Sequence, residues 1–191
     1  PTLMPPQHAR ALAELTNQRW NADLPEMAEA RIMMCAGMPA RWVVPENDTG
    51  TEAILHVHGG GWALCSPMTH EGASRRIAEA CACPVLTVDY RLAPEHPYPA
   101  GLDDILRAWK ALEPGRRWSI GGDSAGANLS LAAMLRLIDE GALVLWVDFT
   151  CVEQDDAARL GIIGHDLAAF IRAAPIRHDE QVDGRIAEHL G

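Results

Sequence analysis

The sequence predicts an α/β fold in which a mostly parallel central sheet carries helices on both of its faces. Segments with strand character alternate with segments of helical periodicity through most of the chain. The strand segments are continuous apolar runs, which is typical of parallel strands covered on both sides. The length of 191 residues suits one domain, because a chain of this size buries about 70% of the surface it exposes when unfolded.

The N-terminal part is predicted to be helical. Residues 7–20 place Ala11, Leu12 and Leu15 on one apolar stripe, and a second short helix is expected over residues 25–34. We therefore divide the chain into an N-terminal helical segment, residues 1–38, and a main domain, residues 39–191, that is shortened after about residue 150. The N-terminal segment is a candidate cap over a binding pocket.

From residue 40 onward, strands and helices follow one another with short connections. The first predicted strand, 40–45, ends in a turn composed of Glu, Asn, Asp, Thr and Gly. Further strands are predicted at 52–57, 84–89, 117–121, 142–149 and 160–163. Helices are predicted at 69–81, at 102–112, from Ser124 onward, and at 184–190, and a proline-rich loop is predicted at 91–99.

Charge and hydropathy exclude several classes of protein. Twenty-six acidic residues against sixteen basic ones give a net charge of −10, which disfavours binding to nucleic acid or to anionic membranes. No segment approaches the roughly 20 apolar residues that a membrane span requires. The first residues lack the basic and apolar regions of a secretory signal, so we expect a cytoplasmic protein.

Cysteine and histidine spacing gives no metal or disulfide motif. The cysteines number five, and the closest pair is C-A-C rather than the C-x-x-C of redox and zinc sites. We expect reduced thiols and no metal site.

The stretch IGGDSAGAN contains the candidate nucleophile. Gly122 to Gly126 fits the pattern G-x-S-x-G between a predicted strand and a predicted helix, which is the setting of a nucleophile elbow. Small flanking residues allow the sharp turn that raises the Ser124 hydroxyl above the sheet. The helix that follows directs its first N–H groups toward any anion formed beside Ser124.

A second glycine-rich segment, HGGGW at residues 58–62, follows an earlier predicted strand. Three glycines in succession carry an entropic cost, which indicates that bare main chain must approach a ligand. Their N–H groups, together with that of Ala125, would form an oxyanion hole for acyl transfer. The segment lacks the Lys and Ser/Thr of a phosphate-binding P-loop.

Three blocks in order, HGGGW at 58–62, DYRLAPEHPYPA at 89–100 and GDSAG at 122–126, resemble the hormone-sensitive-lipase-like esterases of the α/β-hydrolase fold. The resemblance covers roughly residues 40–150. It implies an α/β-hydrolase fold and cofactor-free hydrolysis of small-molecule carboxylic esters. It also implies that Ser124 is the nucleophile and that Gly60, Gly61 and Ala125 are the oxyanion donors.

The resemblance assigns supporting roles to other residues. Asp89, Tyr90, Arg91 and Glu95 match a block that braces the sheet and the neighbouring loop, Asp123 orients the elbow, and Asp148 matches a position outside the catalytic set. His58 is interpreted as fixing the glycine loop. A role as the catalytic base is the sharper alternative, but this fold places its base after the serine.

The histidine and the carboxylate that activate Ser124 should follow it in the chain, where the resemblance thins. Asp166 is our candidate acid, because the apolar run 160–163 leads into a turn similar to the one that carries the acid in this family. His178 is our candidate base, because a short helical segment follows it, as one follows the catalytic histidine of the family. The order Ser124, Asp166, His178 is that of the fold. Other acidic residues and histidines of the tail could also supply such a pair.

Three explanations for the short C-terminal part stay open: a natural or engineered minimal hydrolase, a truncated and repaired gene product with a scrambled tail, or a sequence that lacks internal segments. The first hypothesis for function is a serine carboxylesterase for short to medium acyl esters. The alternative is a catalytically incomplete hydrolase-fold protein that binds a small ligand or a partner.

An uncovered sheet edge would favour a homodimer. Four residues could line an acyl pocket, although we favour core packing for them: Trp20, Met33, Met34 and Trp62.

Overall fold

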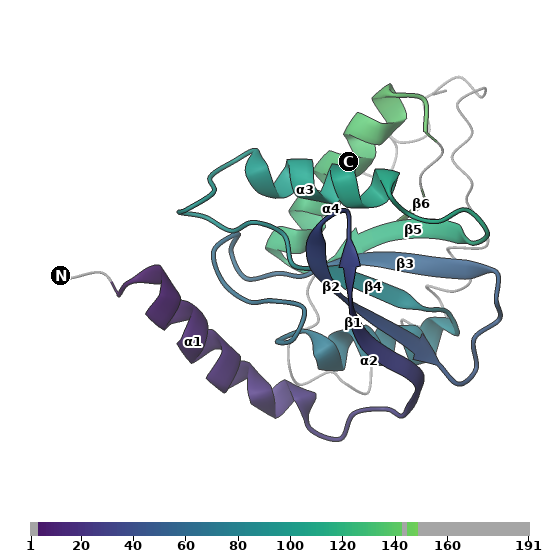
Figure 1. Cartoon of the computed structure of the whole chain (residues 1–191), viewed down its shortest axis with the longest axis horizontal. Helices are drawn as coiled ribbons and strands as arrows, with labels where there is room; N and C mark the ends of the chain where they lie inside the picture. Colours follow the sequence, from purple (N-terminus) through teal and green to yellow (C-terminus); the bar gives the residue numbers. More distant parts are fainter. Residues whose placement is uncertain (1–3, 143–144, 149–191) are drawn as a thin grey trace, which may run out of the picture.

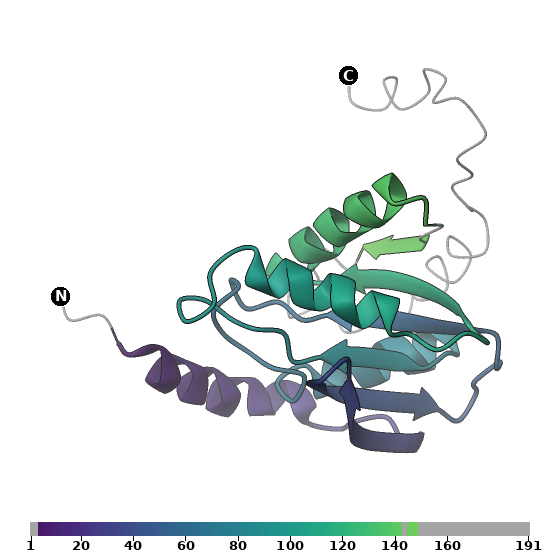
Figure 2. The same ribbon diagram turned by 45° about the horizontal axis from the view of Figure 1, so that its top comes forward.

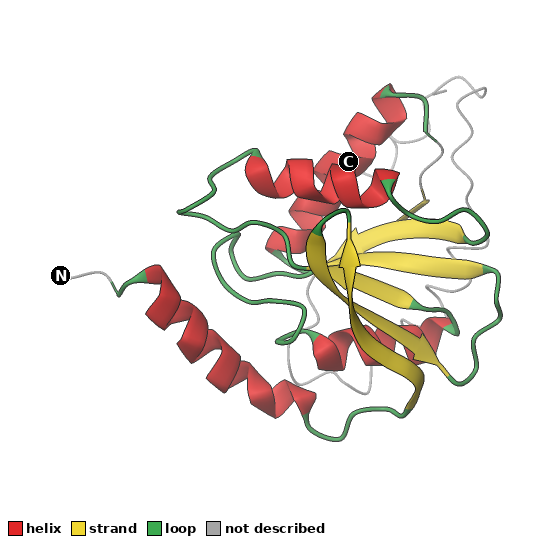
Figure 3. Cartoon of the chain, in the orientation of Figure 1, coloured by secondary structure: helices red, strands yellow, loops and turns green. Residues whose placement is uncertain are grey.

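The computed structural model describes residues 4–142 and 145–148, and it contains one six-stranded mixed sheet with helices on both faces (Figures 1 and 3). The helices are α1 (Pro6–Asn17), the 3-10 helix η1 (Gln18–Asn21), α2 (Glu71–Cys81), α3 (Ala100–Lys110) and α4 (Ala125–Asp139). The strands are β1 (Met27–Cys35), β2 (Met38–Pro45), β3 (Glu52–Val57), β4 (Val85–Val88), β5 (Arg117–Gly122) and β6 (Leu145–Asp148).

The strand order is β1-β2-β4-β3-β5-β6. The four strands β4, β3, β5 and β6 run parallel, as the apolar runs predicted, and β1 and β2 are added antiparallel at one side. Because β3 and β5 are parallel neighbours, the segments that follow them emerge at the same edge of the sheet. These segments are HGGGW and GDSAG, so the sheet itself brings the two motifs together.

The predicted helix at 25–34 is wrong, since these residues contribute most of strand β1. Strand β1 pairs with β2 from Met27 opposite Pro45 to Cys35 opposite Met38, with one register shift between Met27 and Glu29. Ala36 and Gly37 connect the two strands, and both have positive φ, at 49° and 80°. Two central residues with positive φ form the type I′ turn that suits a two-residue hairpin, and hairpin pairing overrides the helical spacing of the methionines.

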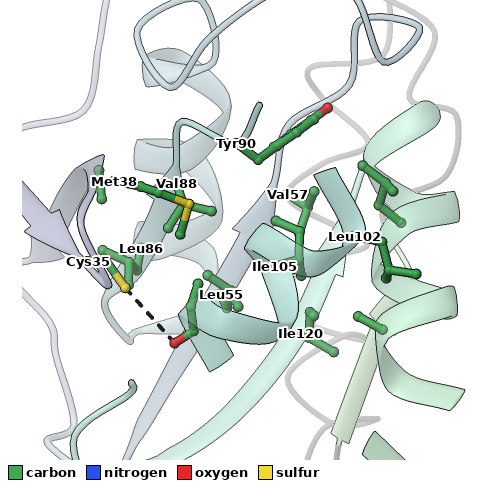
Figure 4. Close-up of a cluster of buried hydrophobic side chains, with 14 of the residues drawn as sticks. Cys35, Met38, Leu55, Val57, Leu86, Val88, Tyr90, Leu102, Ile105 and Ile120 are labelled. Carbon is green, nitrogen blue, oxygen red and sulfur yellow. Dashed lines mark hydrogen bonds between the residues drawn. The ribbon is translucent and has the colours of Figure 1, made fainter. Parts of the chain in front are cut away.

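The core has one cluster of side chains on each side of the sheet. Helices α3 and α4 pack over Leu55, Leu86 and Ile120, and Figure 4 shows this cluster in close-up. Helix α2 packs over Ile54 and Val85 on the opposite face. Adjacent residues of one strand therefore enter different clusters, because side chains alternate across a strand. Figure 2 shows α2 on the other side of the sheet from α3 and α4.

Helix α1 lies outside these layers, beside the loops that follow the strands (Figure 1). The predicted helix at 7–20 is confirmed as α1 and η1, yet none of the residues in α1 is buried. Leu12 and Leu15, which the periodicity placed on an apolar stripe, are 54% and 64% exposed. Whether residues 1–38 act as a cap stays a prediction.

Candidate active site

Ser124 occupies the sharp turn between β5 and α4. Its backbone has φ 50° and ψ −120°, a conformation that L-residues rarely adopt, and its side chain is exposed. Strained backbone of this kind persists only where the surrounding structure enforces it, and it is a known feature of nucleophile elbows. The main-chain N–H groups of Gly126 and Ala127 both bond the carbonyl of Asp123, so helix α4 begins directly at the serine.

The glycines on either side of Ser124 are required by close packing. A β-carbon on Gly122 or on Gly126 would overlap the carbonyl oxygen of Val57, the last residue of β3. On Gly126 it would also lie 2.6 Å from the carbonyl oxygen of His58. The elbow backbone therefore rests against the start of the HGGGW segment, and a side chain at either glycine would push the two motifs apart.

The HGGGW segment forms a tight loop whose glycines serve different purposes. A β-carbon on Gly59 would overlap the Asp123 carboxylate, and one on Gly60, where φ is 113°, would overlap the carbonyl oxygen of Leu64. A β-carbon on Gly61 would meet open space, so this glycine is favoured by its positive φ of 61° alone. The first two glycines allow the main chain to approach Asp123 and Leu64 closely, and the predicted approach to a ligand stays a prediction.

Three main-chain N–H groups beside the elbow have no acceptor among the residues that the structure describes. Within residues 4–142 and 145–148, the N–H groups of Gly60, Gly61 and Ala125 make no hydrogen bond. Unpaired donors at a turn and at the first position of a helix can bind an anion that develops nearby. The resemblance implies that these three are oxyanion donors, and this role stays a prediction.

The carboxylate of Asp123 joins the two motifs. Its Oδ1 accepts a hydrogen bond of 3.0 Å from the N–H of Gly59, and its Oδ2 lies 3.3 Å from Nε2 of His70. Nε2 of His56 lies 3.5 Å from Oδ1. Burial alone would raise the pKa of this carboxyl, but the hydrogen bonds and charges of His56 and His70 outweigh it and hold the pKa well below its usual value of 3.8. Asp123 is thus an anion that ties the glycine loop to the elbow.

His58 fixes the glycine loop from inside the protein. Its ring is fully buried, its Nδ1 donates to the carbonyl of Gly59 over 2.8 Å, and it stacks on Tyr90 at a centroid distance of 4.4 Å. The Tyr90 hydroxyl donates to the carbonyl of His58. Burial lowers the pKa of His58 from 6.5 to about 3, so the ring is neutral near pH 7. No hydrogen bond joins His58 to Ser124 in the described chain, which agrees with a structural role.

The block at 89–100 braces the same region, as expected. Arg91 makes a bidentate ion pair with the fully buried Asp104 of α3. Glu95 pairs with Arg10 of α1. The Arg10 guanidinium also donates to the carbonyls of Ala63, just after the glycine loop, and Ala93. Helix α1 is therefore attached to the glycine loop through this arginine.

The four residues named as candidates for lining an acyl pocket differ in burial. Met33 packs against the core cluster of α3 and α4, as core packing predicts. Met34 and Trp62 are 61% and 49% exposed, and Trp20 is half-buried.

The predicted acid and base, Asp166 and His178, lie outside the described residues. In the described chain the Ser124 side chain makes no hydrogen bond. The residues that sequence reasoning missed are His56, His70 and Arg10. They act over separations of 53 or more residues, and no local pattern marks them. The one available signal was the proximity of His56 to the end of a strand.

Neither metal binding nor a membrane span is apparent in residues 4–142 and 145–148. No group of three or more His, Cys, Asp or Glu side chains there could hold a metal ion. The helices among these residues are too short or too polar to traverse a bilayer.

Comparison with known proteins identifies a family. A family model described as the alpha/beta hydrolase fold matches residues 54–160. The chain is 36% identical over 124 residues to an acetyl-hydrolase of Streptomyces hygroscopicus, covering 59% of this chain and 41% of that protein. It is 41% identical over 113 residues to the carboxylesterase NlhH of Mycobacterium tuberculosis, covering 52% of this chain and 35% of that protein.

Solved structures agree with this match. An esterase from the bacterial hormone-sensitive lipase family superposes with a TM-score of 0.70 at 26% identity, over 92% of this chain and 66% of the other. The chain spans less than half the length of the two curated relatives.

Proposed function

The chain belongs to the α/β-hydrolase family and is similar to its hormone-sensitive-lipase-like esterases, and from this premise we propose that it hydrolyses small carboxylic esters through an acyl-enzyme on Ser124. The observation that carries the proposal is the strained turn at Ser124 beside three N–H groups that are unpaired within the described part of the chain. The relatives named carboxylesterase and acetyl-hydrolase favour ester bonds as the target.

The proposed reaction has two steps. In the first, the Ser124 oxygen attacks the ester carbonyl, and the N–H groups of Gly60, Gly61 and Ala125 stabilise the negative oxygen of the tetrahedral intermediate. The alcohol leaves with a proton, and the acyl group stays on Ser124. In the second step, water attacks the acyl-enzyme and releases the carboxylic acid, which restores the serine.

Both steps need a base near Ser124, and we propose His178 for this role, with Asp166 fixing its tautomer. Their order after the nucleophile is that of the fold. His178→Gln should lower kcat by several powers of ten, while His189→Gln, a change of the same type in the same tail, should leave it unaltered. Asp166→Asn and Asp179→Asn form the corresponding pair for the acid.

The test of the function is release of p-nitrophenol from p-nitrophenyl acetate, butyrate and octanoate by the full chain beside Ser124→Ala. Hydrolysis that disappears with the serine supports the proposal, and the ranking of the three esters gives the preferred acyl length. Equal background release from both proteins would contradict it, and binding of a ligand or partner through the same fold would then be the better interpretation.

The remaining proposals concern the oligomeric state, the cellular location and the N-terminal segment. A homodimer and a cytoplasmic location stay predictions, and light scattering after size-exclusion chromatography would test the first. Within residues 1–38, helix α1 is proposed as the cap, because Arg10 attaches it to the carbonyl of Ala63, next to the glycine loop, whereas residues 27–35 form strand β1 of the sheet. Arg10→Ala should therefore raise KM for the longer esters more than for the acetate.

A further inference from the structure

The direction of the Gly61 N–H group is set by the peptide group that it shares with the carbonyl of Gly60. This peptide is trans, because the cis peptides of the described chain lie elsewhere, and in a trans peptide the N–H and the C=O point in opposite directions. The Gly60 carbonyl accepts hydrogen bonds from the N–H groups of Ala63, over 3.2 Å, and Leu64, over 2.9 Å. The Gly61 N–H therefore points away from the turn formed by residues 60–64, and it keeps this direction only while the turn keeps its shape.

Two further carbonyls of this turn are bonded to other parts of the chain. The carbonyl of Trp62 accepts from the N–H of Ala93 over 2.8 Å, which joins the turn to the loop at 91–99. The carbonyl of Ala63 accepts from Nε of Arg10 over 2.9 Å. Nη2 of Arg10 donates to the carbonyl of Ala93 over 2.8 Å. Arg10 therefore bonds both the turn and the loop to which the turn is joined.

The guanidinium of Arg10 is itself held by Glu95. Nη1 and Nη2 donate to the two carboxylate oxygens over 3.0 and 2.7 Å. The planar guanidinium presents its donors in fixed directions, so one side chain bonds two carbonyls and a carboxylate at once. Within residues 4–142 and 145–148, no other group donates to the carbonyls of Ala63 and Ala93. Without the guanidinium, both carbonyls would lose this hydrogen bond and the turn would be less restrained.

Helix α1 meets the turn through polar groups rather than through its apolar stripe. Glu14, one helical turn after Arg10, accepts a hydrogen bond of 2.6 Å from the Ser66 hydroxyl. The Arg10 side chain is 28% exposed, whereas Leu12 and Leu15 are more than half exposed. The face of α1 that meets the loops is thus the one that can hold main-chain groups in fixed positions.

We propose that Arg10 is a positioning residue for the reaction, which sets the direction of the Gly61 N–H by holding the turn at 60–64 against the loop at 91–99. This inference rests on the proposed function, in which that N–H stabilises the tetrahedral intermediate. Arg10 acts through main-chain carbonyls rather than on the substrate. Helix α1 then contributes to kcat as well as to any cover over the pocket.

The alternative is that Arg10 only attaches α1 as a cap. Its loss would then raise KM for longer esters and leave kcat for the acetate unaltered, because a cap contacts the acyl chain and does not orient an oxyanion donor. The two roles therefore separate in the smallest ester.

The first test is the kinetics of p-nitrophenyl acetate hydrolysis by the full chain and its variants. We expect Arg10→Ala to lower kcat about tenfold, with KM changed by less than roughly twofold, because the N–H acts on the transition state and complete loss of such a donor costs about 10²–10³ in kcat. Arg10→Lys keeps the charge but not the planar set of donors, so we expect a similar loss. Arg31→Ala, which removes an exposed arginine paired with Glu29 on β1, should retain the wild-type kcat.

The second test does not depend on activity. Order parameters from 15N relaxation report the motion of single N–H bonds, at about 0.85 for rigid backbone and below about 0.6 for flexible backbone. We expect the order parameter of Gly61 to fall in Arg10→Ala and to stay at its wild-type value in Arg31→Ala. Gly101 in α3 should keep its value in all three proteins.

The outcomes separate the two proposals. In a protein that hydrolyses the ester through Ser124, wild-type kcat in Arg10→Ala or in Arg10→Lys would overturn the positioning role while the proposed function stands. An unaltered order parameter of Gly61 in Arg10→Ala would overturn it as well. Absence of Ser124-dependent hydrolysis in the wild type would contradict the proposed function, and the relaxation data would still decide whether Arg10 holds the turn.

Discussion

The buried ring of His58 should make the stability of the protein depend on pH between pH 7 and pH 5. In the folded state its pKa is lowered from 6.5 to about 3 by burial, whereas in the unfolded chain the ring has its ordinary pKa. Between these two values the unfolded state binds a proton that the folded state does not. The free energy of unfolding therefore has its full value above pH 6.5 and falls as the pH is lowered toward 3.

The size of the effect follows from the shift. Each pKa unit corresponds to about 1.4 kcal/mol, so a shift from 6.5 to about 3 amounts to roughly 5 kcal/mol when the whole interval is crossed. Between pH 7 and pH 5 the loss is about 2 kcal/mol. The carboxyls with lowered pKa, such as Asp123, lose their contribution only below the pKa of an unfolded carboxyl, about 4. The change in the free energy of unfolding between pH 7 and pH 5 therefore comes from histidine rather than from these carboxyls.

The assay is urea unfolding followed by tryptophan fluorescence at pH 7, 6 and 5, for the wild type and for His58→Asn. Asn can donate to the carbonyl of Gly59 and does not titrate, and other histidines cancel in the comparison. The wild type should lose about 2 kcal/mol more than the variant over this interval. Parallel pH dependence in the two proteins would refute the reasoning. If the variant does not fold, histidine NMR of the wild type replaces it, and a His58 ring that gains a proton above pH 5 would be the contrary result.

Two further substitutions test the packing and the ion pairs. Gly126→Ala should cost about 3 kcal/mol or more, because its β-carbon would overlap the Val57 carbonyl. Gly101→Ala in α3 should cost less, because its β-carbon would lie 3.2 Å from the Tyr90 ring and 3.3 Å from the Arg91 carbonyl rather than overlap main chain; equal urea midpoints would contradict this. Glu71→Gln should lower the free energy of unfolding by about 3 kcal/mol, because Glu71 is 4% exposed and accepts hydrogen bonds from two arginines. Glu140→Gln, which breaks an exposed ion pair with Lys110, should lower it by less than about 0.5 kcal/mol. Similar losses for the two variants in thermal unfolding would count against the burial argument.

Much of the fold was predictable from local sequence patterns. The strand β3 has the predicted bounds, and β5 differs from its prediction by one residue, since apolar runs ended by glycine motifs mark buried parallel strands clearly. Strand β1 was missed, because most of its residues are exposed and its apolar residues also fit helical spacing. Its strand conformation comes from pairing with β2, which periodicity within one segment does not reveal.

The parts of the candidate site that depend on glycines could be predicted from the sequence. The parts that depend on contacts between residues far apart in the chain could not. Ser124 and the glycine loop are marked by glycines that the structure requires for close approach and for positive φ. The links from Asp123 to His56 and His70 could not be predicted, because they form only once the sheet places β3, α2 and the elbow together. A single histidine in a strand gives no sign of the carboxylate it will bond.

The central claim is that Ser124 forms a covalent acyl-enzyme, and intact-mass spectrometry with peptide mapping tests it most directly. The full chain and Ser124→Ala would each be incubated with p-nitrophenyl butyrate, quenched in acid within the first turnover, and digested. The account predicts a butyryl group on the peptide that contains Ser124 in the wild type and none in the variant. An unmodified Ser124 peptide while p-nitrophenol is released, or butyryl transfer of equal extent in Ser124→Ala, would contradict it.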